Sequence, residues 1–158
     1  MDTRSLLRDR SPRCTVRGLS LALAGVLCLS ACSDAVLPLL TAWQAELKPV
    51  SPVQRVTGQV AVLSQPGRSE TTIQITGADE GVTYAWRILT GTCGSQGDVV
   101  GGRASYPQLL AGADGVATGE TVLSRELNPE GEYAAWMFRL VAGGGETAAA
   151  CGVLRRSR

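Results

Sequence analysis

The chemistry open to this chain is limited first by a residue type that it lacks, because none of its 158 residues is histidine. Without an imidazole, the chain can form neither a Ser-His-Asp triad nor a Cys-His pair. It also lacks the side chain that most often binds zinc and copper in proteins. Thiols, carboxylates and guanidinium groups remain. We therefore predict no catalytic residues, no resident metal and no cofactor.

The five cysteines fall into two groups, and the first group belongs to an N-terminal segment typical of a secretion signal. Several arginines precede residues 19–31, an apolar stretch of about 13 residues, which is too short for a membrane span of roughly 17–25. The stretch ends in Leu29-Ser30-Ala31-Cys32, which resembles the bacterial lipobox. The resemblance implies that a signal peptide, residues 1–31, is removed and that Cys32 is acylated.

An acylated Cys32 would anchor the chain to a lipid bilayer. Ser33 follows it, and by resemblance to the sorting rules of Gram-negative bacteria the absence of aspartate there implies the outer membrane. We therefore expect an outer-membrane lipoprotein of the bacterial cell envelope that faces the periplasm. The signal segment holds five of the fifteen basic residues and two of the fourteen acidic ones, so the remainder is slightly acidic. This balance gives no indication of a nucleic-acid partner.

Cys93 and Cys151 form the second group of cysteines. Cys14 and Cys28 leave with the signal peptide, and lipid blocks Cys32. Two thiols then remain in an oxidising compartment, where disulfides persist. We predict one disulfide between them, and the alternative is a pair of free thiols that binds a metal.

The mature chain divides into a tether and one domain. Residues 32–55 are expected to be the lipidated N-terminus and a tether, in which prolines interrupt long elements and at most one short helical turn forms, around residues 39–47. Residues 56–158 are expected to be the folded domain, because short stretches there alternate apolar and polar residues. The predicted strands cover residues 56–63, 70–76, 82–89, 121–127, 132–141 and 147–154.

Glycine, proline and asparagine turns separate these strands, and no convincing amphipathic helix accompanies them. The pattern predicts an all-β fold, an antiparallel sandwich or barrel. Residues 94–120 break the rhythm, because they are rich in glycine and carry only short apolar runs. We interpret them as a long loop, which in a compact domain is usually functional or disordered.

The order of these features resembles the bacterial copper/zinc superoxide dismutases and their lipoprotein relatives. Residues 45–63 resemble that family's first strand pair, and ITGADEGVTYAWRI, at 75–88, resembles its metal-binding passage. TGTCG, at 90–94, and ACGVL, at 150–154, resemble the sequences around its two bridge cysteines. The resemblance covers about residues 45–154 and implies a Greek-key β-barrel that the same disulfide pins.

The family's metal chemistry does not follow from this resemblance. Two of its copper histidines align with Arg87 and Leu89, and a later one aligns approximately with Phe138. A copper redox site in this fold requires imidazole, which binds both oxidation states of the metal. We therefore interpret the domain as a superoxide dismutase-like barrel without its metals, and not as an enzyme.

Two main function hypotheses follow. In the first, the chain is a non-catalytic binding or scaffolding module of the envelope, with a protein partner and with Arg87, Asp98 and Arg103 as its possible binding surface. In the second, a superoxide dismutase-type activity uses unusual metal ligands such as Asp98, Asp114 and Met137. A purely structural role in the envelope is a third hypothesis, which the sequence does not separate from the first.

Arg87 and the arginine-rich C-terminal end each allow two interpretations. Arg87 is expected to lie along a solvated barrel face with its stem on its neighbours, and binding of an anion or a partner is the alternative. The last four residues, RRSR, are expected to form a disordered, solvated end. Docking of this end on anionic lipid head groups is the alternative there.

Overall fold

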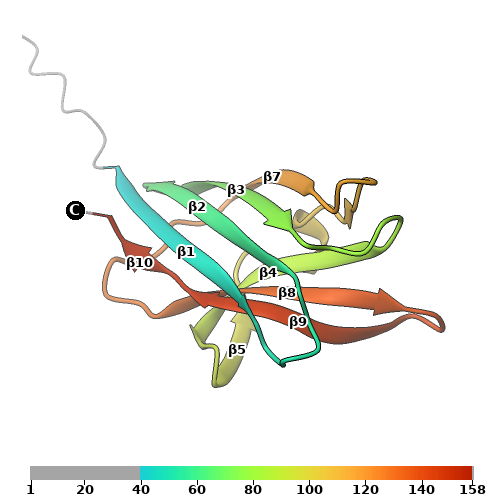
Figure 1. The fold of residues 1–158 in the computed structure, drawn as a ribbon. Helices are drawn as coiled ribbons and strands as arrows, with labels where there is room; N and C mark the ends of the chain where they lie inside the picture. The colour runs from blue at the N-terminus through green and yellow to red at the C-terminus, as the bar shows by residue number, and fades with distance from the viewer. Residues whose placement is uncertain (1–39, 158) are drawn as a thin grey trace, which may run out of the picture. The chain divides into compact units, whose positions relative to one another are not determined.

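The computed structural model describes residues 40–157, and every regular element in this part of the chain except one is a strand (Figure 1). The strands are β1 (Thr41–Pro49), β2 (Thr57–Gln65), β3 (Arg68–Thr76), β4 (Thr83–Thr92), β5 (Ser95–Val99), β6 (Leu109–Leu110), β7 (Ala117–Leu123), β8 (Tyr133–Val141), β9 (Gly145–Val153) and β10 (Arg155–Arg156). The exception is a single 3₁₀ turn, η1 (Arg103–Ser105). The predicted all-β fold class is confirmed.

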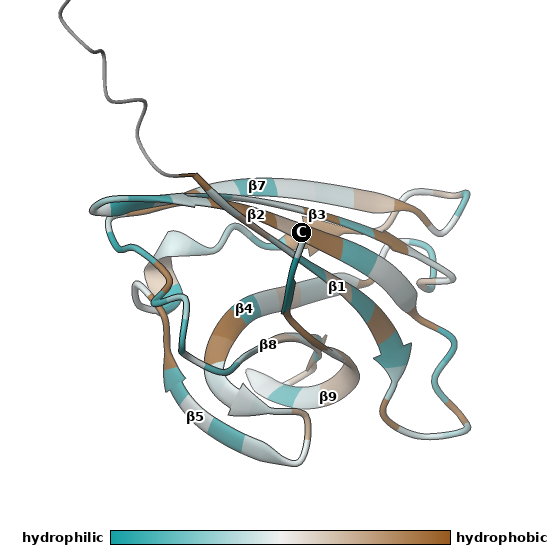
Figure 2. Cartoon of the chain, turned by 90° about the vertical axis from the view of Figure 1, so that its left-hand side faces the viewer, coloured by the Kyte–Doolittle hydropathy of each residue, from teal (hydrophilic) through white to brown (hydrophobic). Residues whose placement is uncertain are grey.

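The strands form one antiparallel sheet in the order β5-β4-β8-β9-β1-β2-β3-β7, with β10 beside β1 and β6 beside β4. This sheet curls into a half-barrel, in which β1, β2, β3 and β7 lie opposite β4, β8 and β9 (Figure 2). Three neighbouring pairs, β3–β7, β4–β8 and β9–β1, join strands that are far apart in the sequence. The other four neighbouring pairs in this order join consecutive strands, so the sheet combines hairpins with long-range pairings.

Side chains from one face of each strand fill the inside of the half-barrel. In β2 and β3, Val60, Val62, Ile73 and Ile75 are buried, while the residues between them are exposed. Residues two apart share a face of a strand, so this alternation confirms the strands predicted at these positions. The largest fully buried side chains include Trp86, Tyr84, Leu47, Ile88, Leu109 and Leu123.

Strands β4 and β8 are buried on both faces. Trp86 and Met137 point into the half-barrel, whereas their neighbours point to the outer face and form a second apolar cluster. This second cluster consists of Leu89, Ala134, Trp136, Phe138 and Cys151. Cys93 and Val99, from the segment that follows β4, pack against it. Burial on both faces explains why YAAWMF in β8 is a continuous apolar run and not an alternating one.

The folded domain begins earlier than predicted, because residues 41–49 form β1 and are not part of a tether. β1 pairs with β2 along its length and with β9 at its end. It buries Trp43 and Leu47 on the inner face. Pro49 is the last residue of the strand and Pro52 lies in the turn after it, so neither proline interrupts β1. The predicted tether and helical turn are wrong for this stretch.

The segment 94–120 is also more regular than predicted, since it holds β5, η1, β6 and the start of β7. Gly97 lets β5 approach β4 closely, because a Cβ there would lie only 2.3 Å from the Thr90 hydroxyl oxygen. Tyr106 anchors the middle of the segment, and its hydroxyl donates to the Val100 carbonyl at 2.7 Å. The prediction of one long loop is wrong.

The structure tests the prediction for the C-terminal end of the chain but not the one for the N-terminal end. Arg155 and Arg156, expected in a disordered end, pair with β1 as strand β10. The predicted signal peptide, residues 1–31, and the acylated Cys32 lie outside the described residues. Within residues 40–157, no helix is long and apolar enough to cross a membrane.

Candidate functional site

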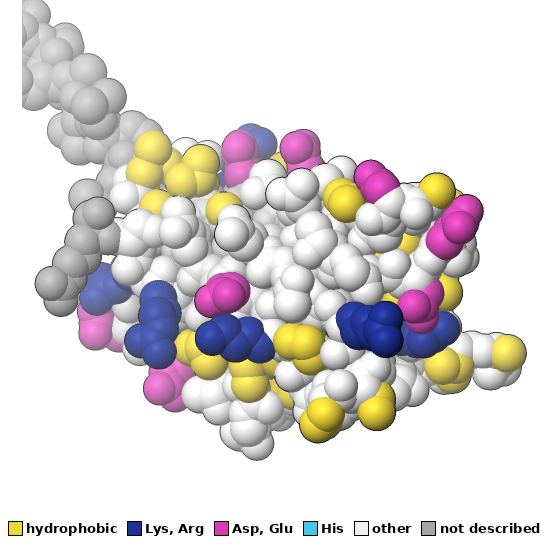
Figure 3. All heavy atoms as spheres, viewed as in Figure 1, with side chains coloured by type: hydrophobic (Ala, Val, Ile, Leu, Met, Phe, Trp, Pro, Cys, Tyr) yellow, Lys and Arg dark blue, Asp and Glu magenta, His cyan; other side chains and the backbone are white. Residues whose placement is uncertain are grey.

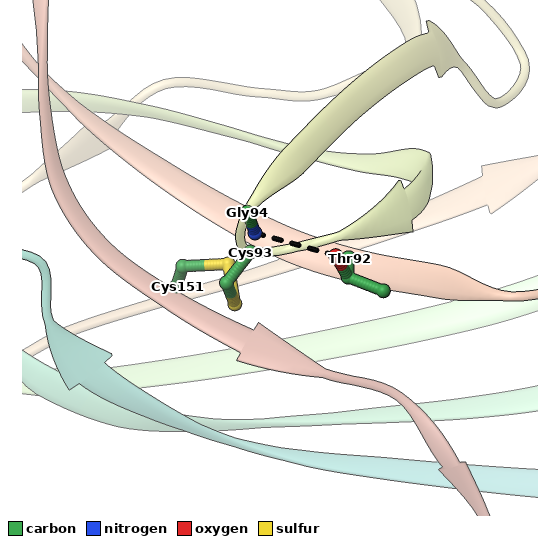
Figure 4. The surroundings of a disulfide bond; sticks show 4 residues. All are labelled: Thr92, Cys93, Gly94 and Cys151. Atoms are coloured by element: carbon green, nitrogen blue, oxygen red, sulfur yellow. Dashed lines mark hydrogen bonds between the residues drawn. A yellow bond between two sulfur atoms is a disulfide. The ribbon is translucent and has the colours of Figure 1, made fainter.

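The predicted disulfide is present. Cys93, in the turn between β4 and β5, is bonded to Cys151 of β9, with an S–S distance of 2.02 Å and Cα atoms 5.8 Å apart (Figure 4). In the same turn the Gly94 amide donates to the Thr92 hydroxyl at 3.3 Å. The bridge therefore holds the β4–β5 turn against β9, beside the second apolar cluster.

Arg87 lies on the same outer face and is almost completely buried, with 5% of its surface exposed. Its Nη1 donates to Glu146 Oε2 at 2.9 Å, and its Nη2 donates to Glu146 Oε1 at 2.5 Å. Arg87 is on β4 and Glu146 on β9, so the pair crosses β8, the strand between them. Two parallel hydrogen bonds to one carboxylate fix the orientation of the guanidinium group as well as its charge.

Phe138 and Arg103 complete this arrangement. The Arg87 guanidinium carbon lies 4.5 Å from the centroid of the Phe138 ring, which is within cation–π range. Arg103 Nη1, from η1, lies 3.8 Å from Glu146 Oε2. The Arg103 side chain is 71% exposed and that of Glu146 is 27% exposed. These four residues, which we call the arginine–glutamate cluster, therefore run from the second apolar cluster out to solvent.

An irregularity in β9 brings Glu146 and the disulfide to one face. The register with β8 shifts, so that Met137 pairs with Ala150 but Phe138 pairs with Ala148. One extra residue in β9, a β-bulge, therefore falls between these pairs. In a regular strand, Glu146 and Cys151 would point to opposite faces, because they are an odd number of residues apart. The bulge places both on the outer face.

The charges of the cluster control the protonation of Glu146. Hydrogen bonds from Arg87 hold the pKa of the Glu146 carboxyl below its ordinary value of 4.5. Partial burial raises this pKa, and the positive charges of Arg87 and Arg103 lower it further. Glu146 is therefore ionised at neutral pH, and the cluster carries two positive charges and one negative charge.

The structure brings together two of the three residues predicted as a binding surface. Arg87 and Arg103 meet at Glu146, although the expectation that Arg87 lies on a solvated face is wrong, because the second cluster and Glu146 cover it. Asp98 lies apart from them on β5, where its amide donates to the Thr90 hydroxyl at 2.9 Å. Of the predicted surface, only Arg103 and Asp98 are open to a partner.

The unusual ligands of the metal hypothesis are not brought together. Met137 is fully buried inside the half-barrel, whereas Asp98 and Asp114 are exposed. The Asp114 carboxylate accepts a hydrogen bond from the Val116 amide at 3.0 Å within its own turn. Among the described residues, no group of three or more histidine, cysteine or acidic side chains could hold a metal ion.

Sequence reasoning missed Glu146. It is the one acidic residue of β9, a strand that otherwise consists of small and apolar side chains with a threonine and the bridge cysteine. A charged residue in a strand of otherwise small and apolar side chains usually has a partner of opposite charge, because an unpaired buried charge is costly. This signal could have indicated that Glu146 is paired, but not that Arg87 is its partner.

An open groove lies beside the disulfide, on the side of β1. Glu46, Lys48, Cys93, Cys151 and Arg155 are among the residues that line it. The Lys48 ammonium nitrogen is 3.8 Å from Glu46 Oε2, and both side chains are mostly exposed, so this pair adds little stability. The groove is lined by both polar and apolar residues, and it offers no set of side chains with an evident chemistry.

No protein-family model matches the chain. A search of curated proteins also finds no match.

Proposed function

We propose that this chain is a bacterial envelope lipoprotein, anchored in a lipid bilayer through an acylated Cys32. Its domain is a superoxide dismutase-like Greek-key barrel that lacks the histidines of the metal site. It acts as a non-catalytic binding or scaffolding module toward another envelope protein. The strand order is consistent with a Greek-key barrel, because β4 pairs with β8 and β9 pairs with β1 across long stretches of sequence.

The proposal rests on the two residues that stand where the resemblance implies copper ligands, Arg87 and Leu89. There Arg87 forms a two-point ion pair with Glu146, and Leu89 packs in the second apolar cluster. A guanidinium group that keeps its proton and an aliphatic side chain give a metal no lone pair to bind. The domain has a disulfide and a packed outer face, while the chemistry at this position is that of a structural ion pair.

The cluster also supplies a contact surface. Arg103 is the exposed member, and its Nη1 lies 3.8 Å from Glu146 Oε2, whose other partner is the buried Arg87. The two positive charges exceed the one negative charge, so the surface favours an acidic group on the partner. We assign the partner-binding role to this exposed arginine and, apart from it, to the exposed face of β5 that carries Asp98.

The anchor is tested by expressing the full chain in a Gram-negative host and weighing the membrane-bound product. We expect a mature chain that begins at Cys32 and carries the mass of the acyl chains. The Cys32→Ser variant should keep its first residues and carry no lipid. A membrane-bound wild-type chain without added lipid mass would contradict the anchor.

The absence of metal chemistry is tested by native mass spectrometry after incubation with copper and zinc. We expect the disulfide-bonded mass with no retained metal. A stoichiometric copper adduct would overturn this part of the proposal and favour the enzyme hypothesis, and an assay of superoxide dismutation would then follow.

The binding role is tested by photo-cross-linking in cells from a reactive residue placed at position 103. A matched control places the same group at Arg68, an exposed arginine of β3. We expect a discrete cross-linked protein from position 103 and none from position 68. Equal yields at both positions, or no product at either, would contradict a binding surface at the cluster.

A further inference from the structure

The last strand fixes two arginines beside the start of the domain. β10 pairs with the first half of β1, with Trp43 opposite Arg156 and Gln44 opposite Arg155. The Ser157 amide also donates to the Ala42 carbonyl at 2.9 Å. Figure 1 shows the C-terminal end close to the beginning of β1. Both arginines are exposed, so two guanidinium groups stand at the end of the domain where β1 begins.

Exposed aliphatic side chains lie at the same end. Leu40 precedes β1 and is 59% exposed, and Leu63 of β2, opposite Ala42, is 50% exposed. Val122 of β7 is exposed too, and the register places it in line with Leu63 across β3. In Figure 3 hydrophobic and basic side chains both appear at the left-hand end of the face, where β1 begins, with acidic ones among them.

The predicted anchor joins the domain at this end. Cys32 precedes Thr41 by only nine positions in the sequence, a length of chain that spans at most about 30 Å when fully extended. Val53 lies in the turn after β1, at the opposite end of the domain. The chain between Cys32 and this turn includes the whole of β1 as well as the residues before it. The end that carries Arg155 and Arg156 is therefore the one that an acylated Cys32 would hold near a bilayer.

We infer that this end of the half-barrel, formed by Leu40, Leu63, Arg155 and Arg156, docks on the anionic phospholipid surface in which Cys32 is anchored. The inference rests on the lipid anchor proposed above. Guanidinium groups bind phosphate through paired hydrogen bonds, and their aliphatic stems tolerate an apolar surface. The exposed leucines at the same end can enter the interface between head groups and acyl chains. Docking would fix which way the arginine–glutamate cluster faces.

Two carboxylates oppose this docking and provide a control of opposite sign. Glu130 and Glu132 lie in the turn before Tyr133, whose ring packs edge-on against Trp43 with centroids 5.6 Å apart. The turn is therefore close to β10, and its negative charges repel an anionic surface. Glu70 contributes less, because Arg68 Nη2 lies 2.8 Å from its carboxylate. Removal of the charges at 130 and 132 should strengthen docking.

The experiment uses the full lipidated chain in vesicles whose phospholipids carry bromine on their acyl chains, because bromine quenches tryptophan fluorescence at short range. The reporter is Leu63→Trp, and the matched control is Val53→Trp at the opposite end of β1, where Val53 is 85% exposed. The native tryptophans, Trp43, Trp86 and Trp136, are all buried, and their signal is subtracted with the unmodified chain. Vesicles of phosphatidylcholine alone are compared with vesicles that also contain phosphatidylglycerol.

We expect bromine to quench Leu63→Trp in the phosphatidylglycerol vesicles and to leave Val53→Trp unquenched. Arg155→Glu with Arg156→Glu should abolish most of this quenching, and Glu130→Gln with Glu132→Gln should increase it. Added salt should reduce it, because the attraction is electrostatic.

Failure of the docking and failure of the anchor give different results. If the chain floats with the vesicles but both reporters are quenched equally or not at all, the docking inference is wrong while the anchor stands. Quenching that the arginine reversal leaves unchanged would also overturn it. If the chain does not float with the vesicles, the anchor is wrong and the docking inference falls with it.

Discussion

Arg87 and Glu146 are bonded to each other across a strand to which neither belongs. Both terminal nitrogens of Arg87, on β4, donate to the carboxylate of Glu146, on β9, and β8 lies between. The pair therefore ties three adjacent strands together on their outer face, above the ring of Phe138. It also joins this face to η1 through Arg103.

Substitution of Glu146 and substitution of Arg87 should lower the free energy of unfolding by different amounts. Glu146→Gln leaves the Arg87 charge buried without a counter-ion and should lower the free energy of unfolding by about 2–4 kcal/mol. Arg87→Met should cost less, because the carboxylate that remains is partly open to water. Denaturant unfolding of both variants and of the double variant gives the coupling energy, which we expect to exceed about 1 kcal/mol.

The control for this comparison is Glu70→Gln, which removes an ion pair whose two side chains are about half exposed. Its effect should stay within about 0.5 kcal/mol. Additive single effects at Arg87 and Glu146 would contradict the direct pair.

The same pair should make stability fall in acid. The folded state holds the pKa of Glu146 below its ordinary value of 4.5, so the carboxylate contributes stability that is fully present above that pH. The contribution is lost as the pH falls from 4.5 through the folded-state value. Unfolding free energy measured against pH should therefore decline less steeply below 4.5 in Glu146→Gln than in the wild type. Identical acid slopes would exclude Glu146 as the group responsible.

The disulfide should raise the free energy of unfolding and should also keep the β4–β5 turn over the second apolar cluster. It joins residues 58 positions apart, and in the chain-entropy model such a loop contributes roughly 4 kcal/mol. Cys93→Ser with Cys151→Ser should therefore unfold at lower denaturant. The free β4–β5 turn should also expose the second apolar cluster, so quenching of Trp136 by a soluble quencher should rise. Unchanged stability after reduction would show that packing alone holds the turn.

Alternation was sufficient to predict the strands that are buried on one face. β2 and β3 follow the expected ranges closely, because Val60, Val62, Ile73 and Ile75 alternate with polar residues. The disulfide could be predicted because only two cysteines are left for a folded domain. Both inferences depend on local pattern or on counting, which a single sequence supplies.

The arrangement of the site depends on features that leave no local signal. The extra residue of β9 changes which face the following residues occupy, and the run of alanines there hides it. Arg87 and Glu146 are brought together only by the order of three strands, which their spacing in the sequence does not show. The residue pattern missed β1 for a different reason: Pro49 is the last residue of the strand and Pro52 lies beyond it, where they do not disturb pairing.

Tyr106 should make the protein sensitive to alkali. Burial raises its pKa to about 12 from an ordinary value of 10.0. An acidic group with a raised pKa contributes stability that is fully present below pH 10.0 and is lost as the pH rises toward 12. This loss amounts to about 3 kcal/mol at most. Tyr106→Phe should be less stable at neutral pH, because it lacks the hydrogen bond to Val100, yet should lose less stability above pH 10.0.

The close approach of β9 to β1 should depend on a glycine. A Cβ at Gly152 would lie 2.3 Å from the Glu46 carbonyl oxygen and 2.8 Å from the carbonyl carbon, and backbone atoms cannot move aside as a side chain can. Gly152→Ala should therefore push the end of β9 away from β1 and lower the free energy of unfolding by about 1–3 kcal/mol. Denaturant unfolding measures the loss, and hydrogen exchange should show faster exchange of the Val50 amide, which donates to Ala149.

Gly94→Ala is the matched control for this substitution. Gly94 lies beside the other bridge cysteine, its Cβ would meet nothing closer than the Thr92 hydroxyl oxygen at 3.9 Å, and it does not need a left-handed backbone. The change should stay within about 0.5 kcal/mol. If Gly152→Ala were equally mild, the close approach of β9 to β1 would not be needed for stability, and the pairing of β10 with β1 would be sufficient to hold this seam of the half-barrel.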